Sequence, residues 1–565
     1  MNKILHYASL LSIMAILLTT LIPTKEYFWG TEDVILACTI PTVTVFAITT
    51  LLTRDTKHPI GRMDSVLMLW YIYYTAYAYI YSPYPASQSI LRLTFLLVTF
   101  YSTSYILRHN KHYIKTISIL IIAICFAECL IGVYQLINGQ SRNNLYPLTG
   151  TLLNPGPYGI LLSCGLLMYI GAIRKDKTIY YLPQYIRSTI IFLFACMIIA
   201  TGSRTSIIAF LVCLAYMFRH YAKTYIWSIV PGFLVLTCVL YFHKQESADG
   251  RIVMYVISIY NIIQHPIFGS GIGSFLHQHA TGSADLSHLL PTSFFFNHDV
   301  ITTPFNLPLY IGVEQGGIGI LFLFLTIAVT IKPIKKCDRT IKLLIPLLTI
   351  STLFSYTFEI LSFQLLAVFS LAVVSQDDKP VIVLNKKAVI SVFSLFFILT
   401  ASSFEYIMPR AEANSEYSKT KGRHTEFQLK RYHRLLPLMY DTPSFLFDYA
   451  QMLSAHNCFN DSNDILRKGQ LVCADPMFYI LQANNYVKLH EYAIAELHYK
   501  KAYSMMPNRI YPLYKLMKLY IESSQRGKAV MTAERIINFR VKIESIATRQ
   551  IRQEAKDFLL HAQQI

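Results

Sequence analysis

Charged residues are scarce in this chain. They make up 15% of its 565 residues, whereas apolar residues make up 54%, and the mean hydropathy is +0.40. This balance excludes an ordinary soluble protein and is typical of one with many membrane spans. Paired CxxC motifs are missing among the ten cysteines, so the cysteines predict no metal site. Eight lie in or beside apolar runs as expected small fillers, and Cys458 and Cys473 are a candidate disulfide.

A small-residue cleavage site is also missing after the first apolar run. We therefore expect that run to stay as a helix rather than to be removed as a signal peptide. Runs of about 18 apolar residues, the length that crosses a bilayer, recur along the chain. The thirteen predicted spans are residues 5–22, 34–52, 65–81, 90–107, 114–137, 158–173, 189–200, 205–218, 226–242, 307–331, 341–358, 361–374 and 388–407.

Lysine and arginine are few in the loops on one side of these spans. With a cytoplasmic N-terminus, most basic loop residues fall in the cytoplasm, as the positive-inside rule requires. The outer loops receive only Lys25, Arg142, Arg204, Lys244 and Arg251. The loop at 243–305 and the chain after 408 then lie outside. The same pattern explains most of the net charge of +18, so we expect no nucleic-acid partner.

The longest polar interruption, residues 243–305, is where we expect the chemistry. Residues 251–264 have the pattern of an amphipathic helix that lies along the bilayer surface, with Arg251 as its first residue. His265-Pro266 would end this helix, and the glycines that follow permit a sharp turn back to the membrane.

Arg204 lies in a tight turn, residues 201–206, between two spans on the same side as Arg251. A guanidinium presents a planar fork of donors that matches phosphate oxygens. The two arginines therefore suit a lipid-linked diphosphate at the outer leaflet. A lone interfacial arginine is also often a simple anchor.

Two further polar features interrupt the early spans. The turn-rich stretch at 150–158 frees backbone groups that must line a polar cavity or be buried in protein, and Arg142 just before it is a candidate member of that cavity. Glu128 in the middle of the fifth span either braces the bundle or lines a pathway.

Five features in this order resemble the O-antigen ligase family, which includes Wzy-type polymerases and bacterial protein O-oligosaccharyltransferases. They are the Asn154-Pro155 turn, the Gly202-Ser203-Arg204 turn, Gly250-Arg251, His265-Pro266 with Gly269, Gly271 and Gly273, and Glu314 with Gly316 and Gly319. The resemblance covers about the first 400 residues.

The resemblance implies an all-α, GT-C-like bundle of about 12 to 13 transmembrane helices in the bacterial inner membrane. It also implies transfer of a glycan from undecaprenyl diphosphate to an acceptor hydroxyl at the periplasmic face, with neither a metal nor another cofactor. Arg204 and Arg251 would be catalytic and would bind the diphosphate, and Arg142 and Glu314 would be further residues of the donor site.

The family's third key residue, a histidine before an asparagine, is replaced here by Phe305. His298 is the nearest substitute as a general base, because it lies in the outer loop beside Asp299. A solvated loop histidine is the alternative for His298, and His288 and His265 are weaker candidates. The reaction also needs no strong base if positioning supplies much of the rate.

The composition becomes soluble and charged after residue 408, which predicts a transmembrane domain at 1–408 and a periplasmic helical domain at 409–565. Within the latter, 476–509 matches the 34-residue tetratricopeptide pattern, with a degenerate copy after it and earlier copies expected in 415–475. Its repeat positions are Tyr479, Ala483, Tyr486, Ala495, Tyr499 and Ala502. Such an array usually binds a protein partner, and a structural cap is the alternative.

The predicted partners are the lipid-linked glycan, membrane lipids and an acceptor, which is either the lipid A core or an exported protein. The appended domain modestly favours a protein acceptor. A Wzy-type polymerase and a non-catalytic transporter or scaffold for the lipid-linked glycan are the alternatives. The spans carry few ionisable residues, which argues against a transporter.

Overall fold

The computed structural model describes residues 2–19, 57–141, 143, 145–173, 182–218, 231–232, 235, 241–242, 245–337, 339–421 and 426–563. The predicted span at 34–52 and most of the one at 226–242 lie outside the described residues, as does Arg142.

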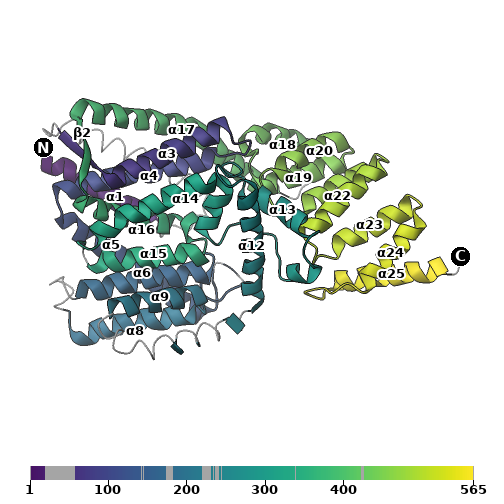
Figure 1. Ribbon diagram of the computed structural model, residues 1–565, viewed down its shortest axis with the longest axis horizontal. Coiled ribbons are helices and arrows are strands. Elements are labelled where there is room, and N and C mark those ends of the chain that lie inside the picture. Colours follow the sequence, from purple (N-terminus) through teal and green to yellow (C-terminus); the bar gives the residue numbers. More distant parts are fainter. Residues whose placement is uncertain are drawn as a thin grey trace.

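The other predicted spans coincide with helices that form a bundle (Figure 1). In chain order these helices are α1 (Asn2–Leu18), α3 (Arg62–Ile80), α4 (Ser87–His109), α5 (His112–Asn138), α6 (Pro155–Ile173), α8 (Gln184–Ala200), α9 (Arg204–Met217), α14 (Leu307–Ile334), α15 (Arg339–Phe354), α16 (Leu361–Val374) and α17 (Lys386–Thr420). The prediction of a helical bundle is therefore confirmed.

Several of these helices have the length and the surface of membrane spans. Among the described residues, α4, α5, α6 and α14 are long and apolar enough to cross a bilayer, and shorter apolar helices lie beside them. The α14 helix leaves Leu321 55% and Phe324 63% exposed. Large apolar side chains turned outward along a span suit lipid rather than water, so the protein is embedded in a membrane.

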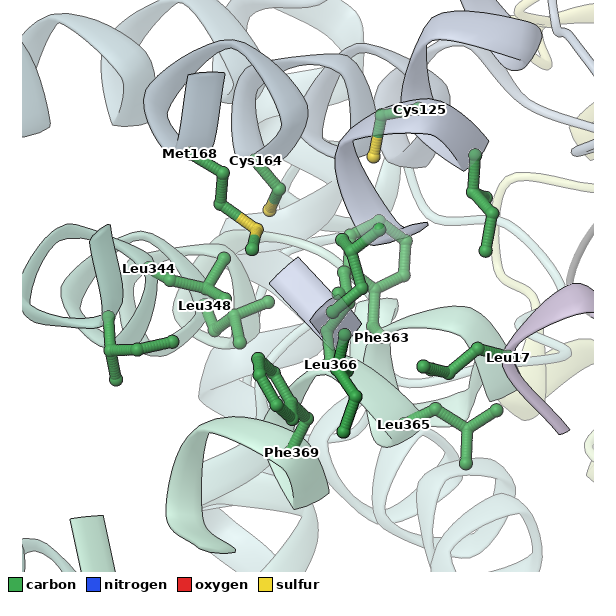
Figure 2. Packing of buried hydrophobic residues seen from close by; sticks show 14 of the residues in the cluster. Leu17, Cys125, Cys164, Met168, Leu344, Leu348, Phe363, Leu365, Leu366 and Phe369 are labelled. Carbon is green, nitrogen blue, oxygen red and sulfur yellow. The ribbon is translucent and has the colours of Figure 1, made fainter. Parts of the chain in front are cut away.

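The centre of the bundle is packed from α5, α6, α15 and α16 (Figure 2). Cys125 and Cys164 are buried there among leucine, methionine and phenylalanine side chains, which matches the expected role of small fillers. A Cβ atom at Gly165 would lie 2.3 Å from the Cβ of Cys125. Small residues thus let α5 and α6 approach closely.

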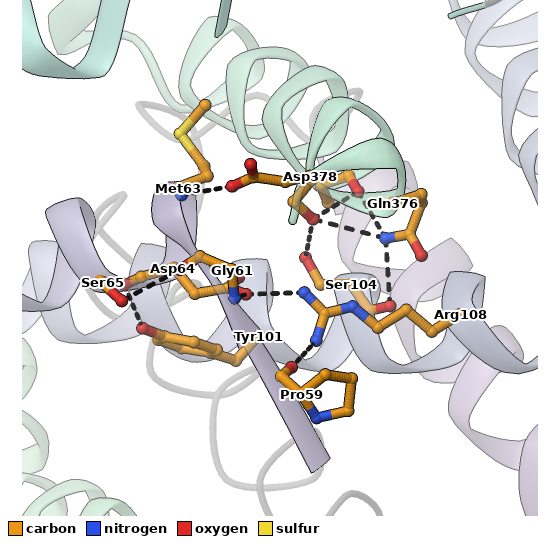
Figure 3. Close-up of polar contacts among 12 residues, drawn as sticks. Pro59, Gly61, Met63, Asp64, Ser65, Tyr101, Ser104, Arg108, Gln376 and Asp378 are labelled. Carbon is orange, nitrogen blue, oxygen red and sulfur yellow. Dashed lines mark hydrogen bonds and ion pairs between the residues drawn. The ribbon is translucent and has the colours of Figure 1, made fainter. Parts of the chain in front are cut away.

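One end of the bundle is closed by a polar network and two strands (Figures 1 and 3). The strands β1 (Lys57–Gly61) and β2 (Pro380–Asn385) pair antiparallel, with Ile60 opposite Ile382; no pattern in the sequence predicted these strands. Beside them Arg108 Nη2 lies 2.6 Å from Asp64 Oδ2. The backbone N–H of Met63 donates to Asp378 Oδ2 at 2.9 Å, which joins α3 to the chain just before β2.

Figure 1 shows α12 (Gln245–Gln264) running across the opposite end of the bundle, between it and the C-terminal helices. The predicted amphipathic helix is confirmed, but it begins six residues earlier, so Arg251 lies in its second turn. One apolar side, with Val253 and Ile257, packs on α13 (Phe275–Leu286) and the short helix η2 (Thr292–Phe295). Ile259 and Ile263 point outward and are exposed.

Glycines fasten the segment after α12 to a kink in α14. Gly316 has φ +60° and ψ −152°, which breaks the helix there. The N–H groups of Ser270 and Gly271 donate to the carbonyls of Val313 and Glu314 at 2.8 and 3.1 Å. A Cβ at Gly316 would lie 2.5 Å from the backbone N of Gly269. Only glycine permits this backbone-to-backbone approach.

The C-terminal part is a row of helices in which each packs on its neighbours in sequence, as in a solenoid (Figure 1). They are α18 (Glu426–Met439), α19 (Pro443–Ala455), α20 (Phe459–Gln470), α21 (Met477–Lys488), α22 (Tyr492–Met505), α23 (Tyr511–Glu522), α24 (Arg526–Ile537) and α25 (Ile546–Gln563).

The α21 and α22 pair forms the predicted repeat, with Ala483, Ala495 and Ala502 fully buried at the helix contact. The predicted domain boundary at 408/409 falls inside α17, which runs unbroken from the bundle into this part. Cys458 and Cys473 are both free thiols.

Candidate functional site

A cavity of about 1050 Å³ lies where the bundle, α12 and the C-terminal helices meet. Its walls come from segments far apart in the sequence. They are Tyr146 with the 154–157 turn, the 201–205 turn, Phe242 with the first turns of α12, the 297–305 loop, residues 355–356 just after α15, and a single residue of the C-terminal part, Lys542. Arg204, Arg251 and His298, the three predicted catalytic residues, all line this cavity.

The turn between α8 and α9 places Arg204. Gly202 has φ +58°, a backbone conformation that favours glycine, and its N–H donates to the carbonyl of Ile199 at 3.0 Å. The chain reverses within four residues, so Arg204 becomes the first residue of α9. Its side chain is thereby presented at the end of the bundle, at the wall of the cavity.

Arg251 is held by a backbone carbonyl and an aromatic ring. Its Nη1 donates to the carbonyl of Phe354 at 2.9 Å, and its guanidinium carbon lies 5.1 Å from the centre of the Phe305 ring. Burial lowers the pKa of Arg251; Tyr255 opposes this shift, and the positive charge of Arg204 adds to it. Both arginines line the same cavity, so an anion bound there would be attracted by two positive charges.

Phe305, which stands where the resemblance leads us to expect a histidine, packs its ring on Arg251. It also meets the ring of Tyr356 edge to face at 5.4 Å. The next residue, Asn306, caps α14 by accepting the N–H of Leu309 at 3.0 Å. This asparagine therefore fixes where α14 begins. It thereby also fixes the position of Phe305, the residue before it, whose ring lies beside Arg251.

Polar side chains of α5 hold the turn that forms another wall. Gln135 Oε1 accepts the N–H groups of Thr149 and Gly150 at 3.0 and 2.8 Å, and Glu128 Oε2 accepts the N–H of Thr151 at 3.0 Å. Of the two alternatives for Glu128, the bracing role fits this contact. The brace fixes the stretch that leads to Asn154 at the cavity.

His298 lines the cavity, but both its ring nitrogens point into the protein. Its Nε2 lies 3.1 Å from Nε2 of His279, and its Nδ1 lies 3.4 Å from Oγ of Ser283. Burial lowers the pKa of His298 to about 4, with Asp299 opposing the shift and Arg509 adding to it. An imidazole so placed is a weak base at neutral pH, and its basic nitrogen is not directed at a substrate.

The remaining predicted site residues are not brought to the cavity. Glu314 is buried in α14, where Oε1 accepts the N–H of Phe275 at 3.4 Å, so it supports the start of α13 rather than lining the donor site. Arg142 lies outside the described residues. His288 is exposed at the end of α13, and His265 belongs to the turn after α12, as expected.

Sequence reasoning missed Lys542 and Glu246. Both line the cavity, and their charged groups lie 3.7 Å apart. Lys542 comes from the segment between α24 and α25, far from every motif of the bundle. No sequence signal marks it, because only the docking of the C-terminal part brings it to the cavity.

This geometry defines a membrane-embedded helical protein with an arginine-lined cavity at one end of its bundle. Residues 189–324 match the family model described as O-Antigen ligase. The match runs from α8 into α14 and includes Arg204 and Arg251. The chain therefore carries an O-antigen ligase domain over these residues.

No curated protein matches the chain. Among solved structures, it is similar to a chain of the "Crystal structure of APC/C hetero-tetramer Cut9-Hcn1", with 12% sequence identity, 92% of this chain and 90% of that chain covered, and a TM-score of 0.20. That score gives no basis for carrying over a fold or a function.

Proposed function

We propose that the protein transfers a glycan from undecaprenyl diphosphate to an acceptor hydroxyl at the periplasmic face of the bacterial inner membrane. The observation that carries the proposal is the meeting of Arg204 and Arg251 at one cavity within the segment that matches the O-antigen ligase family. Two guanidiniums suit a ligand with several negative oxygens, and a diphosphate is such a ligand.

In the proposed reaction, the acceptor oxygen forms a bond to the anomeric carbon of the first sugar. The bond from that carbon to the diphosphate oxygen breaks, and its electron pair stays on the diphosphate. Arg204 and Arg251 stabilise the charge that develops there. The proton of the acceptor passes to water or to the departing diphosphate.

The inward direction of both His298 nitrogens supports a reaction without a strong base, in which positioning supplies much of the rate. We assign His298 a structural role, in which it joins the 297–305 loop to α13. The diphosphate is a good leaving group, which makes a weakly activated hydroxyl sufficient.

The cavity lies at the end of the bundle and is lined by Lys542 of the C-terminal part, which supports an acceptor that comes from outside the bilayer. The lipid A core and a serine or threonine of an exported protein both have such a hydroxyl. We propose that the C-terminal helices lie in the periplasm, with the N-terminus in the cytoplasm, because the basic loop residues follow that orientation.

The test has two parts. Arg204→Ala and Arg251→Ala are expected to abolish transfer while the protein still reaches the membrane, and Arg549→Ala, at an exposed site of α25, is the matched control. Deletion of the protein, followed by separate profiling of lipopolysaccharide and glycoproteins, identifies the acceptor by the pool that loses its glycan. Wild-type transfer by both cavity variants would refute the proposal.

A further inference from the structure

The segment between α24 and α25, residues 538–545, reaches the cavity from the C-terminal part of the chain. It brings Lys542 to the wall that also holds Arg204 and Arg251. This segment lies outside the part of the chain that matches the O-antigen ligase family. Lys542 therefore reaches this cavity from outside the matched segment.

Contacts on both sides of Lys542 fix the segment in place. The guanidinium carbon of Arg540 lies 4.6 Å from the centre of the Phe296 ring, next to the cavity loop. Arg552 Nη2 in α25 donates to the carbonyl of Phe539 at 2.8 Å. The Lys542 backbone is thus anchored to the cavity loop through one neighbour and to α25 through another.

A separate set of hydrogen bonds docks the same part of the chain on the cavity loop. Asn508 Nδ2 donates to the carbonyls of Phe296 and His298 at 3.1 and 2.6 Å. Arg509 Nη2 lies 2.7 Å from Asp299 Oδ1, and Ser283 Oγ donates to the carbonyl of Met505 at 2.8 Å. Lys542 is at the cavity because this interface is formed.

The ammonium of Lys542 forms a weak ion pair that a ligand can replace. Its Nζ lies 3.7 Å from Oε2 of Glu246, whose side chain is 73% exposed. An ion pair this long, with one partner in water, contributes little free energy. A ligand with two phosphoryl groups competes readily for such an ammonium.

Glu246 also shows how near Lys542 lies to the arginines. It is in the first turn of α12, five residues before Arg251, a separation of about 7.5 Å along the helix axis. Both residues line the same cavity. The ammonium is thus within the reach of one ligand that also contacts Arg251.

We propose that Lys542 is a third cation of the donor site, supplied by the C-terminal part of the chain. When the donor enters, the ammonium leaves Glu246 and binds a phosphoryl oxygen of the diphosphate. This inference rests on the proposed function and deepens it, because donor binding then depends on the docking of the C-terminal helices. The role of Lys542 is to bind and position the donor, whereas Arg204 and Arg251 stabilise the leaving charge.

The test compares Lys542→Gln, Lys542→Arg and Glu246→Gln in the full-length protein. Lys528→Gln is the matched control, because Lys528 forms a similar pair with Glu496 at 3.3 Å away from the cavity. The probes are unglycosylated undecaprenyl diphosphate in a binding assay and the glycosylated donor in steady-state transfer. Lys542→Gln is expected to weaken binding of the unglycosylated probe about 10-fold and to raise KM with kcat little changed.

Lys542→Arg is expected to restore binding, Glu246→Gln to keep or tighten it, and Lys528→Gln to behave as wild type. Unchanged binding in Lys542→Gln overturns the inference, and so does an effect seen only with the glycosylated donor, since the lysine would then contact the sugar. Weaker binding in Glu246→Gln also overturns it, because the ion pair itself would be what matters. If Arg204→Ala and Arg251→Ala also bind and transfer normally, the proposed function fails as well.

Discussion

The two ends of the bundle place their arginines in different surroundings. At the end with the strands, Arg108 meets the buried carboxylate of Asp64 at 2.6 Å, and charged side chains join the elements. At the cavity end the segment after α12 is joined to α14 through backbone, at Gly269 and Gly316, and the charged side chains of Arg204 and Arg251 line a cavity. An arginine that faces a carboxylate holds a fold together, whereas two arginines at one cavity suit an anionic ligand.

The strongest test of this difference is to replace one arginine at each end of the bundle. Arg251→Ala is expected to lower the transfer rate by about 100-fold or more with a small change in melting temperature. Arg108→Ala is expected to cost about 2 to 3 kcal/mol of stability, because it leaves Asp64 buried without its counter-charge. Transfer assays and thermal unfolding of the purified variants measure both effects. Equal loss of stability in the two variants would erase the distinction.

Gly316→Ala tests whether the close backbone contact between α14 and the segment after α12 stabilises the protein. A side chain at this φ of +60° would collide with the segment after α12, so we expect a loss of more than about 2 kcal/mol. The measurement is the melting temperature, with proteolysis of the 266–273 segment as a local readout. Gly527→Ala in α24 is the control, since nothing lies near its Cβ position; it is expected to stabilise by about 0.5 to 1 kcal/mol.

Lowering the pH is expected to destabilise the cavity end of the protein. His279 and His298 are buried beside each other, and burial lowers the pKa of both, to about 4 for His298 from an ordinary 6.5. In the unfolded chain these histidines are protonated below about pH 6.5, whereas in the folded protein burial keeps them neutral to lower pH, to about pH 4 for His298. The unfolded state therefore binds more protons in this range, and the free energy of unfolding falls as the pH drops from 6.5 towards 4.

Limited proteolysis at the join between the 297–305 loop and the C-terminal helices, followed across this pH range, measures the effect. His298→Gln should flatten the profile, because one titrating group of the pair is removed. A profile as steep as that of the wild type would show that other groups cause the acid sensitivity.

The smallest expected effect concerns the ring at the position of the family histidine. Phe305→Leu keeps an apolar side chain beside Arg251 but removes the aromatic face, a loss of about 0.5 to 1 kcal/mol. Transfer should fall a few-fold, with the melting temperature nearly unchanged. A fall as large as that of Arg251→Ala would mean that Phe305 does more than orient the guanidinium.

The sequence by itself determined most of the elements. Apolar runs of membrane length specify the bundle helices, because a bilayer admits few other structures. The alanine and tyrosine spacing specified the α21 and α22 pair, and Gly202 and the glycines after α12 marked turns that other residues could not make. Arg204 and Arg251 stood out because arginines are rare in the outer loops.

The tertiary structure alone decided how these parts combine. It turned the ring nitrogens of His298 away from the cavity, placed Glu314 at a structural joint and carried Lys542 to the site from the far end of the chain. Local patterns record helix periodicity and turn chemistry, which depend on neighbours in sequence. The direction of a side chain and the docking of distant segments depend on long-range packing, for which a single sequence contains no local signal.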